Sequence, residues 1–147
     1  MRKELIHKLD YNERMWLYKA IARMVIVDKE VVMCETEDLR ESLVGFSGSN
    51  NKDFKSVLKD PDFILPLKKL NNLKYEHAFI IVSEIARLAS IDGKIVAAEE
   101  NFMKELLELL CFKEEAAKSL TNWMINLAKV NKEEMVLKEK LVNYFHD

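Results

Sequence analysis

The sequence predicts an all-helical protein, and three observations support that prediction. Apolar residues recur three or four positions apart almost everywhere along the chain, and the alternation typical of strands is missing. The 147 residues include only 3 Gly and 2 Pro, too few for the frequent turns of a sandwich or barrel. Apolar residues make up 49% and charged residues 33%, which is typical of a folded globule. At this length we expect residues 1–147 to form a single domain.

The first predicted helix runs from about 11 to 27. Asp10 and Glu13 have the spacing of a capping box, in which each side chain satisfies a backbone N–H of the other residue. Apolar residues surround most of this helix, and a helix of that kind belongs at the centre of a bundle.

Shorter elements are predicted next. A helix from about 33 to 46 is followed by a loop ending at Asn51 that is rich in Gly, Ser and Asn. Residues 53–59 and the stretch that follows Asp60 predict two short helices, and Pro66 keeps the second one brief or kinked.

The second half of the chain predicts longer helices. The first of them is again apolar around most of its circumference, so we expect it to cross the opening helix at the centre of the bundle. Asn131 and Glu134 form a second capping box pattern, which predicts a helix start. The predicted helices are 75–91, 97–110, 114–128 and 131–145.

An internal repeat relates the two halves. The segment IARMVIVDKEVVMCE at 21–35 aligns without a gap with IARLASIDGKIVAAE at 85–99. Both copies share Ile-Ala-Arg, one aspartate, one valine and the final glutamate. We expect a duplication inside one globule, with repeats of about 15–48 and 78–128 related by a pseudo-two-fold axis.

The repeat also predicts a candidate site. In each copy an aspartate ends one helix and a glutamate opens the next, which gives Asp28 with Glu35 and Asp92 with Glu99. If the pseudo-two-fold brings these four carboxylates together, their repulsion requires a cation or protons, and Ca²⁺ or Mg²⁺ prefers such oxygen ligands. The same residues can instead be structural, because aspartates close turns and glutamates stabilise helix N-termini.

The second copy and its continuation, IARLASIDGKIVAAEENFMKELLELLCFKEEAA at 85–117, resemble the TerB-like domains of tellurite resistance proteins. The shared marks are Asp92-Gly93, Glu99 and a long amphipathic helix that ends before Phe112. The resemblance implies a bundle of about seven helices with an internal pseudo-two-fold, a metal site at the acidic motif residues and a role in stress responses. Two positions depart from the family pattern: Lys29 replaces the glycine in the first copy, and Cys111 stands where glycine is frequent.

The departure at Lys29 predicts unequal half-sites. Glycine adopts positive φ readily, and Gly93 is therefore suited to a tight turn. Lysine is not, so the first connection must be strained or follow another path. We expect the second copy to dominate any ion binding.

Function follows from what the sequence contains and lacks. We found no P-loop, GxSxG or HExxH motif and assign no catalytic residue. The first hypothesis is a non-enzymatic binding module that holds a divalent cation. The alternatives are a metal-dependent hydrolase that uses the same carboxylates and a purely structural oligomerisation module. The last helix either closes the core or forms a face for a partner or a homodimer.

Charge and hydropathy limit the partners. The 23 basic and 25 acidic residues give a net charge of −2, which argues against a nucleic-acid binder. The longest apolar run, 20–27, is interrupted by Arg23, so no membrane span is expected. With no secretory signal at the start and two widely separated cysteines, Cys34 and Cys111, we expect a cytoplasmic protein with reduced thiols. An unidentified protein is the expected partner.

Overall fold

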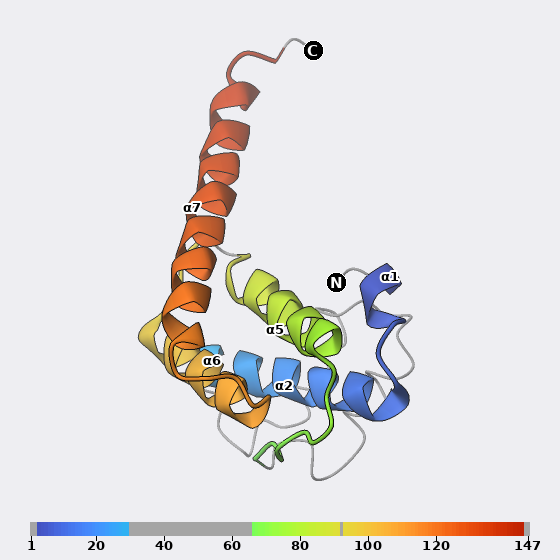
Figure 1. The fold of residues 1–147 in the computed structure, drawn as a ribbon. Helices are drawn as coiled ribbons and strands as arrows, with labels where there is room; N and C mark the ends of the chain where they lie inside the picture. Colours follow the sequence, from blue (N-terminus) through green and yellow to red (C-terminus); the bar gives the residue numbers. More distant parts are fainter. Residues whose placement is uncertain (1–2, 30–65, 92, 146–147) are drawn as a thin grey trace.

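The computed structural model describes residues 3–29, 66–91 and 93–145, and these residues form helices and their connections (Figure 1). No strand occurs in these three ranges, so the all-helical fold class is confirmed for them. The predicted elements at 33–46 and 53–59, and the loop between them, lie outside the described residues. The helices are α1 Lys3–Ile6, α2 Tyr11–Lys29, α5 Tyr75–Ala89, α6 Ala97–Leu109 and α7 Ala116–Val142.

The start of α2 is fixed by the predicted capping box. The backbone N–H of Glu13 donates to Asp10 Oδ1 at 2.8 Å, and the backbone N–H of Asp10 donates to Glu13 Oε1 at 2.8 Å. Two N–H groups that the helix itself cannot satisfy are thereby bonded. The sequence analysis did not predict α1, a single turn that precedes this cap.

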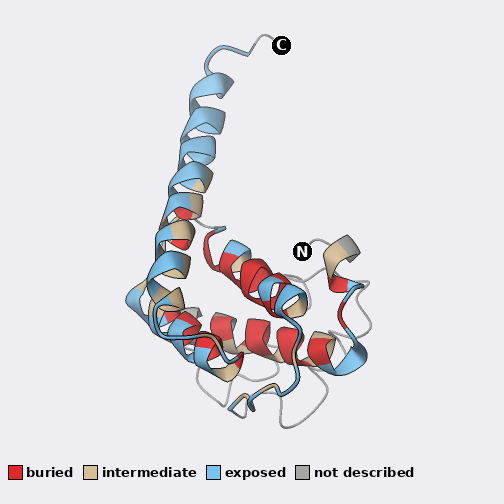
Figure 2. Ribbon diagram, viewed as in Figure 1, coloured by how far each residue is buried: buried red, intermediate tan, exposed pale blue. Residues whose placement is uncertain are grey.

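The two apolar helices lie at the centre, as predicted. Helix α2 packs against α5 and α6, and α5 also packs against α6 and α7. Figure 2 shows buried residues over much of both central helices. Ile21 of α2 and Ile85 of α5, which occupy equivalent positions in the repeat, are both 0% exposed. Burial of these apolar faces is the main force that holds the helices together.

Residues 66–74 form a non-helical strap beside this core. The indole Nε1 of Trp16 donates to the carbonyl of Lys68 at 2.7 Å, and the backbone N–H of Leu70 donates to the carbonyl of Leu109 at 3.2 Å. The strap is therefore bonded to α2 and to the end of α6. The helix predicted before Pro66 lies outside the described residues.

Helix α6 ends in a Schellman motif, in which two N–H groups beyond the helix bond back to its last turn. The backbone N–H of Phe112 donates to the carbonyl of Leu107 at 2.9 Å, and that of Cys111 donates to the carbonyl of Glu108 at 3.0 Å. Cys111 takes the left-handed conformation of this motif, with φ of 68°. This geometry is the one that the glycine of the TerB-like pattern would adopt without strain.

Replacing Cys111 by glycine should therefore stabilise the protein. Relief of the left-handed strain, less the greater freedom of glycine in the unfolded chain, should raise the free energy of unfolding by about 0.5–1.5 kcal/mol. Urea denaturation of Cys111→Gly measures this gain. Cys111→Ser is the control: it removes the exposed thiol but keeps the strain, so its stability should equal that of the parent. Equal stability of all three proteins would contradict the explanation.

The end of the chain differs from the prediction. Two helices were predicted over 114–128 and 131–145, but α7 is one continuous helix from Ala116 to Val142. The residues between the predicted helices contain no Gly or Pro to break it. Asn131 does not cap a new helix; its side-chain Nδ2 donates to the carbonyl of Ser90 at 2.9 Å.

Only the first half of α7 packs on the body of the protein. Met124 and Ala128 are its buried residues, whereas residues 132–145 are all exposed. Figure 1 shows this second half projecting away from the other helices, and Figure 2 shows it exposed along its length. The idea that the last helix closes the core is therefore wrong for residues 132–145. None of the described helices is long and apolar enough to cross a membrane.

Candidate functional site

The predicted acidic cluster falls mostly outside what the structure describes. Glu35 and Asp92 lie outside the described residues, and for Asp28 only the backbone is described, inside α2. Glu99 is the one predicted ligand whose side chain is described. Within the described ranges, no group of three or more His, Cys, Asp or Glu side chains is placed to hold a metal ion. The convergence of the four carboxylates thus stays a prediction.

Glu99 stabilises the start of its own helix. It occupies the third position of α6, and its Oε1 accepts a hydrogen bond from the backbone N–H of Val96 at 3.1 Å. Glu99 is only 3% exposed, and its negative charge lies at the positive end of the helix dipole. Val96 has no side-chain acceptor, so only the carboxylate half of a capping box forms here. This contact is the structural role that the sequence offered as the alternative to metal binding.

The ends of α2 and α5 are not equivalent. Helix α5 ends at Ala89, and a turn follows in which Gly93 has φ of 83°. Helix α2 continues to Lys29, the residue that aligns with Gly93 in the repeat. Lysine is therefore accommodated by a longer helix rather than by a strained turn. At this one position the two copies differ in backbone conformation, because Lys29 is helical and Gly93 has positive φ.

Ser90 bonds the end of α5 to α7, which the sequence did not reveal. It is 0% exposed, and its hydroxyl donates to the carbonyl of Ala86 at 2.7 Å, with the carbonyl of Met124 at 3.3 Å as a second acceptor. Its own carbonyl accepts the hydrogen bond from Asn131. Since Gly93 and Ser90 both lie against α7, the connection after α5 is held in place by this helix.

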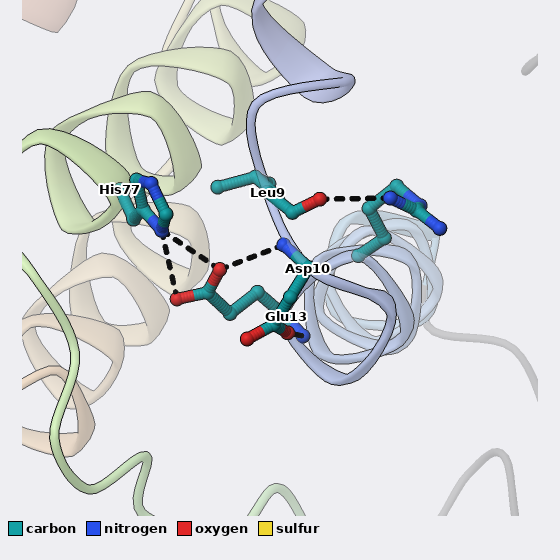
Figure 3. Close-up of polar contacts among 5 residues, drawn as sticks. Leu9, Asp10, Glu13 and His77 are labelled. Carbon is teal, nitrogen blue, oxygen red and sulfur yellow. Dashed lines mark hydrogen bonds and ion pairs between the residues drawn. The ribbon is translucent and has the colours of Figure 1, made fainter.

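A second polar cluster joins α2 to α5 at the opposite end of these helices (Figure 3). His77 Nδ1 lies 2.8 Å from Glu13 Oε1 and 3.0 Å from Glu13 Oε2. Beside it, the guanidinium of Arg14 donates to the carbonyl of Leu9 at 2.7 Å. Glu13 is 8% exposed and also caps α2. Because Glu13 bonds to His77 and also caps α2, we interpret this pair as a structural link between the starts of α2 and α5.

The most unusual surface is the projecting half of α7. A shallow groove of about 640 Å³ runs along it and reaches Ile91 at the end of α5. Its apolar lining includes Ile91, Met135, Leu141, Val142 and Phe145, which are 50–78% exposed. Glu134 and Lys138 lie in the same lining. The sequence analysis offered this helix as a possible partner-binding face, but it did not predict that the helix would project from the other helices.

No protein-family model, curated protein or solved structure matches the chain. The TerB-like resemblance therefore rests on the motif at 85–117 and on its copy in the first repeat, and it stays a prediction. Gly93 with its positive φ agrees with the Asp-Gly turn of that motif.

Proposed function

We propose that this protein is a non-enzymatic binding module whose interaction element is the second half of α7. The observation that carries this proposal is the large apolar surface that the helix presents to solvent. The exposed large apolar residues of this part of α7 and of the residues just beyond it are Val130, Met135, Val136, Leu137, Leu141, Val142, Tyr144 and Phe145.

Such a surface is costly unless it is covered. Large exposed apolar surfaces mark interaction sites on folded proteins. In addition, a helix that leaves the body loses the packing that provides most helical stability in proteins. A partner that buries the apolar residues would restore this packing. Amphipathic helices gain such packing when they bind in a groove or pair with another helix.

The finer parts of this proposal come from the repeat. We propose that the chain is a TerB-like bundle of about seven helices with an internal pseudo-two-fold. In this proposal a Ca²⁺ or Mg²⁺ ion binds Asp28, Glu35, Asp92 and Glu99, and the second copy dominates. The doubled motif and the Gly93 turn support it, whereas the capping contact of Glu99 supports the structural alternative. Calorimetric titration of Ca²⁺, Mg²⁺ and Mn²⁺ into chelator-treated protein distinguishes the metal site from the structural role. A melting temperature independent of these ions would contradict the metal site.

Site-specific photo-crosslinking in cells tests the interaction element. A photoreactive amino acid in place of Leu141, which lines the apolar groove, should give a discrete crosslinked adduct with a protein. The control places it at Glu105, which is exposed on α6, outside the projecting half of α7. Adducts at Leu141 but not at Glu105 are expected. Equal yields at the two positions, or none at either, would contradict the proposal.

A further inference from the structure

Helix α7, from Leu127 onward, and the residues just beyond it carry a pattern that can pair with a second copy of itself. Six residues recur at alternating spacings of four and three, which is the repeat that keeps one stripe of a helix facing a partner helix. We call this stripe the seam. The seam consists of Leu127, Asn131, Glu134, Lys138 and Leu141 of α7 and of Phe145, which follows the end of the helix at Val142. Leu127 and Asn131 are half-buried, and the other four residues are exposed.

Charge decides in which direction two such seams can pair. Glu134 and Lys138 are both exposed and lie at equal distances on either side of Val136. In an antiparallel pair with its two-fold axis at Val136, Glu134 of each chain faces Lys138 of the other. A parallel pair would instead place like charges opposite each other, which is unfavourable.

The same axis also matches the apolar residues. Beside the seam, Val130 faces Val142 and Met135 faces Leu137. Leu127 lies opposite the end of the partner's α7, which Phe145 follows. Phe145 is 78% exposed and Val142 is 69% exposed in the single chain, so such a pair would remove much apolar surface from water.

The one mismatch on the seam is Asn131, which would face Leu141. The Asn131 side chain already donates one hydrogen bond to the carbonyl of Ser90 at 2.9 Å, so one of its two N–H donors is satisfied within its own chain.

The geometry of α7 allows the two chains to approach. Residues 127–142 span about 24 Å of helix, and Figure 1 shows the second half of α7 projecting clear of the other helices. An antiparallel pair places the two bodies at opposite ends of the contact. The contact is isologous, so it closes at two chains and leaves no seam for a third.

We infer that the seam is a homodimer interface in which the second halves of α7 from two chains pack antiparallel about Val136. This inference rests on the proposed function and names its partner, a second copy of this chain. The central Glu134–Lys138 pairs set orientation and register, as polar residues do in coiled coils. The apolar residues on both sides of the pairs supply most of the affinity.

Sedimentation equilibrium of the full chain over a wide concentration range tests the inference. The parent should show a reversible monomer–dimer equilibrium. Glu134→Lys and Lys138→Glu each place like charges in the seam, so each should weaken dimerisation at least roughly tenfold. An equimolar mixture of the two variants should recover a dimer of one chain of each, because every charge then faces its opposite. Lys140→Glu, outside the seam, should dimerise like the parent.

The variants change exposed residues, and unchanged helical circular dichroism and melting of each monomer confirm that it is folded. A parent that stays monomeric at all concentrations overturns the homodimer. Single variants that dimerise as well as the parent, or a mixture that recovers no heterodimer, overturn the antiparallel register. A monomeric parent together with a Leu141 crosslink to a different protein would overturn this inference while supporting the proposed binding function.

Discussion

Replacing Ile85 by alanine should lower the free energy of unfolding by about 2–5 kcal/mol. The side chain is 0% exposed on α5, at the centre of the core. Its truncation removes buried apolar surface and leaves a cavity that neighbouring helices fill only in part. Ile21, the equivalent residue of α2, is also 0% exposed and should give a loss of the same size. Urea denaturation followed by circular dichroism measures both changes.

Ile91 provides the matched control for these variants. It lies two residues beyond the end of α5 and is 59% exposed, so Ile91→Ala should change stability by less than about 0.5 kcal/mol. A loss below about 1 kcal/mol in both core variants would contradict the central position of α2 and α5.

Gly93→Ala should cost about 2–4 kcal/mol, for two reasons that add. Gly93 has φ of 83°, which an alanine adopts only with strain. A Cβ at this position would lie 3.0 Å from Lys132 Cβ and 3.2 Å from Lys132 Cα. The second of these atoms belongs to the backbone of α7, so the helix itself would have to move.

Thermal and urea denaturation of Gly93→Ala measure this loss, with Lys94→Ala as the control. Lys94 is exposed and adjacent, so its truncation should change stability by less than about 0.5 kcal/mol. Equal stability of the two variants would show that the connection after α5 can move away from α7. It would also contradict the view that this turn is locked against the helix.

The sequence predicted the elements whose signals are local. The capping box of Asp10 and Glu13 marked the start of α2, and apolar periodicity located α2, α5 and α6 to within a few residues. The aligned repeat also placed a glycine at a turn that the structure shows to have positive φ. These features depend on residues a few positions apart, and their stereochemistry is the same in many folds.

The end of the chain was predicted less well because the spacing of Asn131 and Glu134 is compatible both with a helix start and with the interior of a helix. Asn131 followed by Glu134 is the spacing of a helix start, yet Asn131 lies inside α7 and bonds to the carbonyl of Ser90, which is 41 residues away in the chain. A helix without Gly or Pro continues unless a capping side chain ends it. Here the Asn131 side chain, which could have capped a new helix, is bonded instead to the carbonyl of Ser90. That choice is visible only when α5 and α7 are seen together.

The candidate site divides in the same way. The sequence alone identified the residues of the acidic motif. It also predicted that the two copies differ, because Lys29 stands in the first copy where Gly93 stands in the second. The tertiary structure decided that Glu99 caps α6 from a buried position, that Glu13 pairs with His77, and that Ser90 joins α5 to α7. It also decided that the second half of α7 stays in solvent. Side-chain spacing fixes which face of a helix is apolar, but whether that face is buried depends on where the neighbouring helices end.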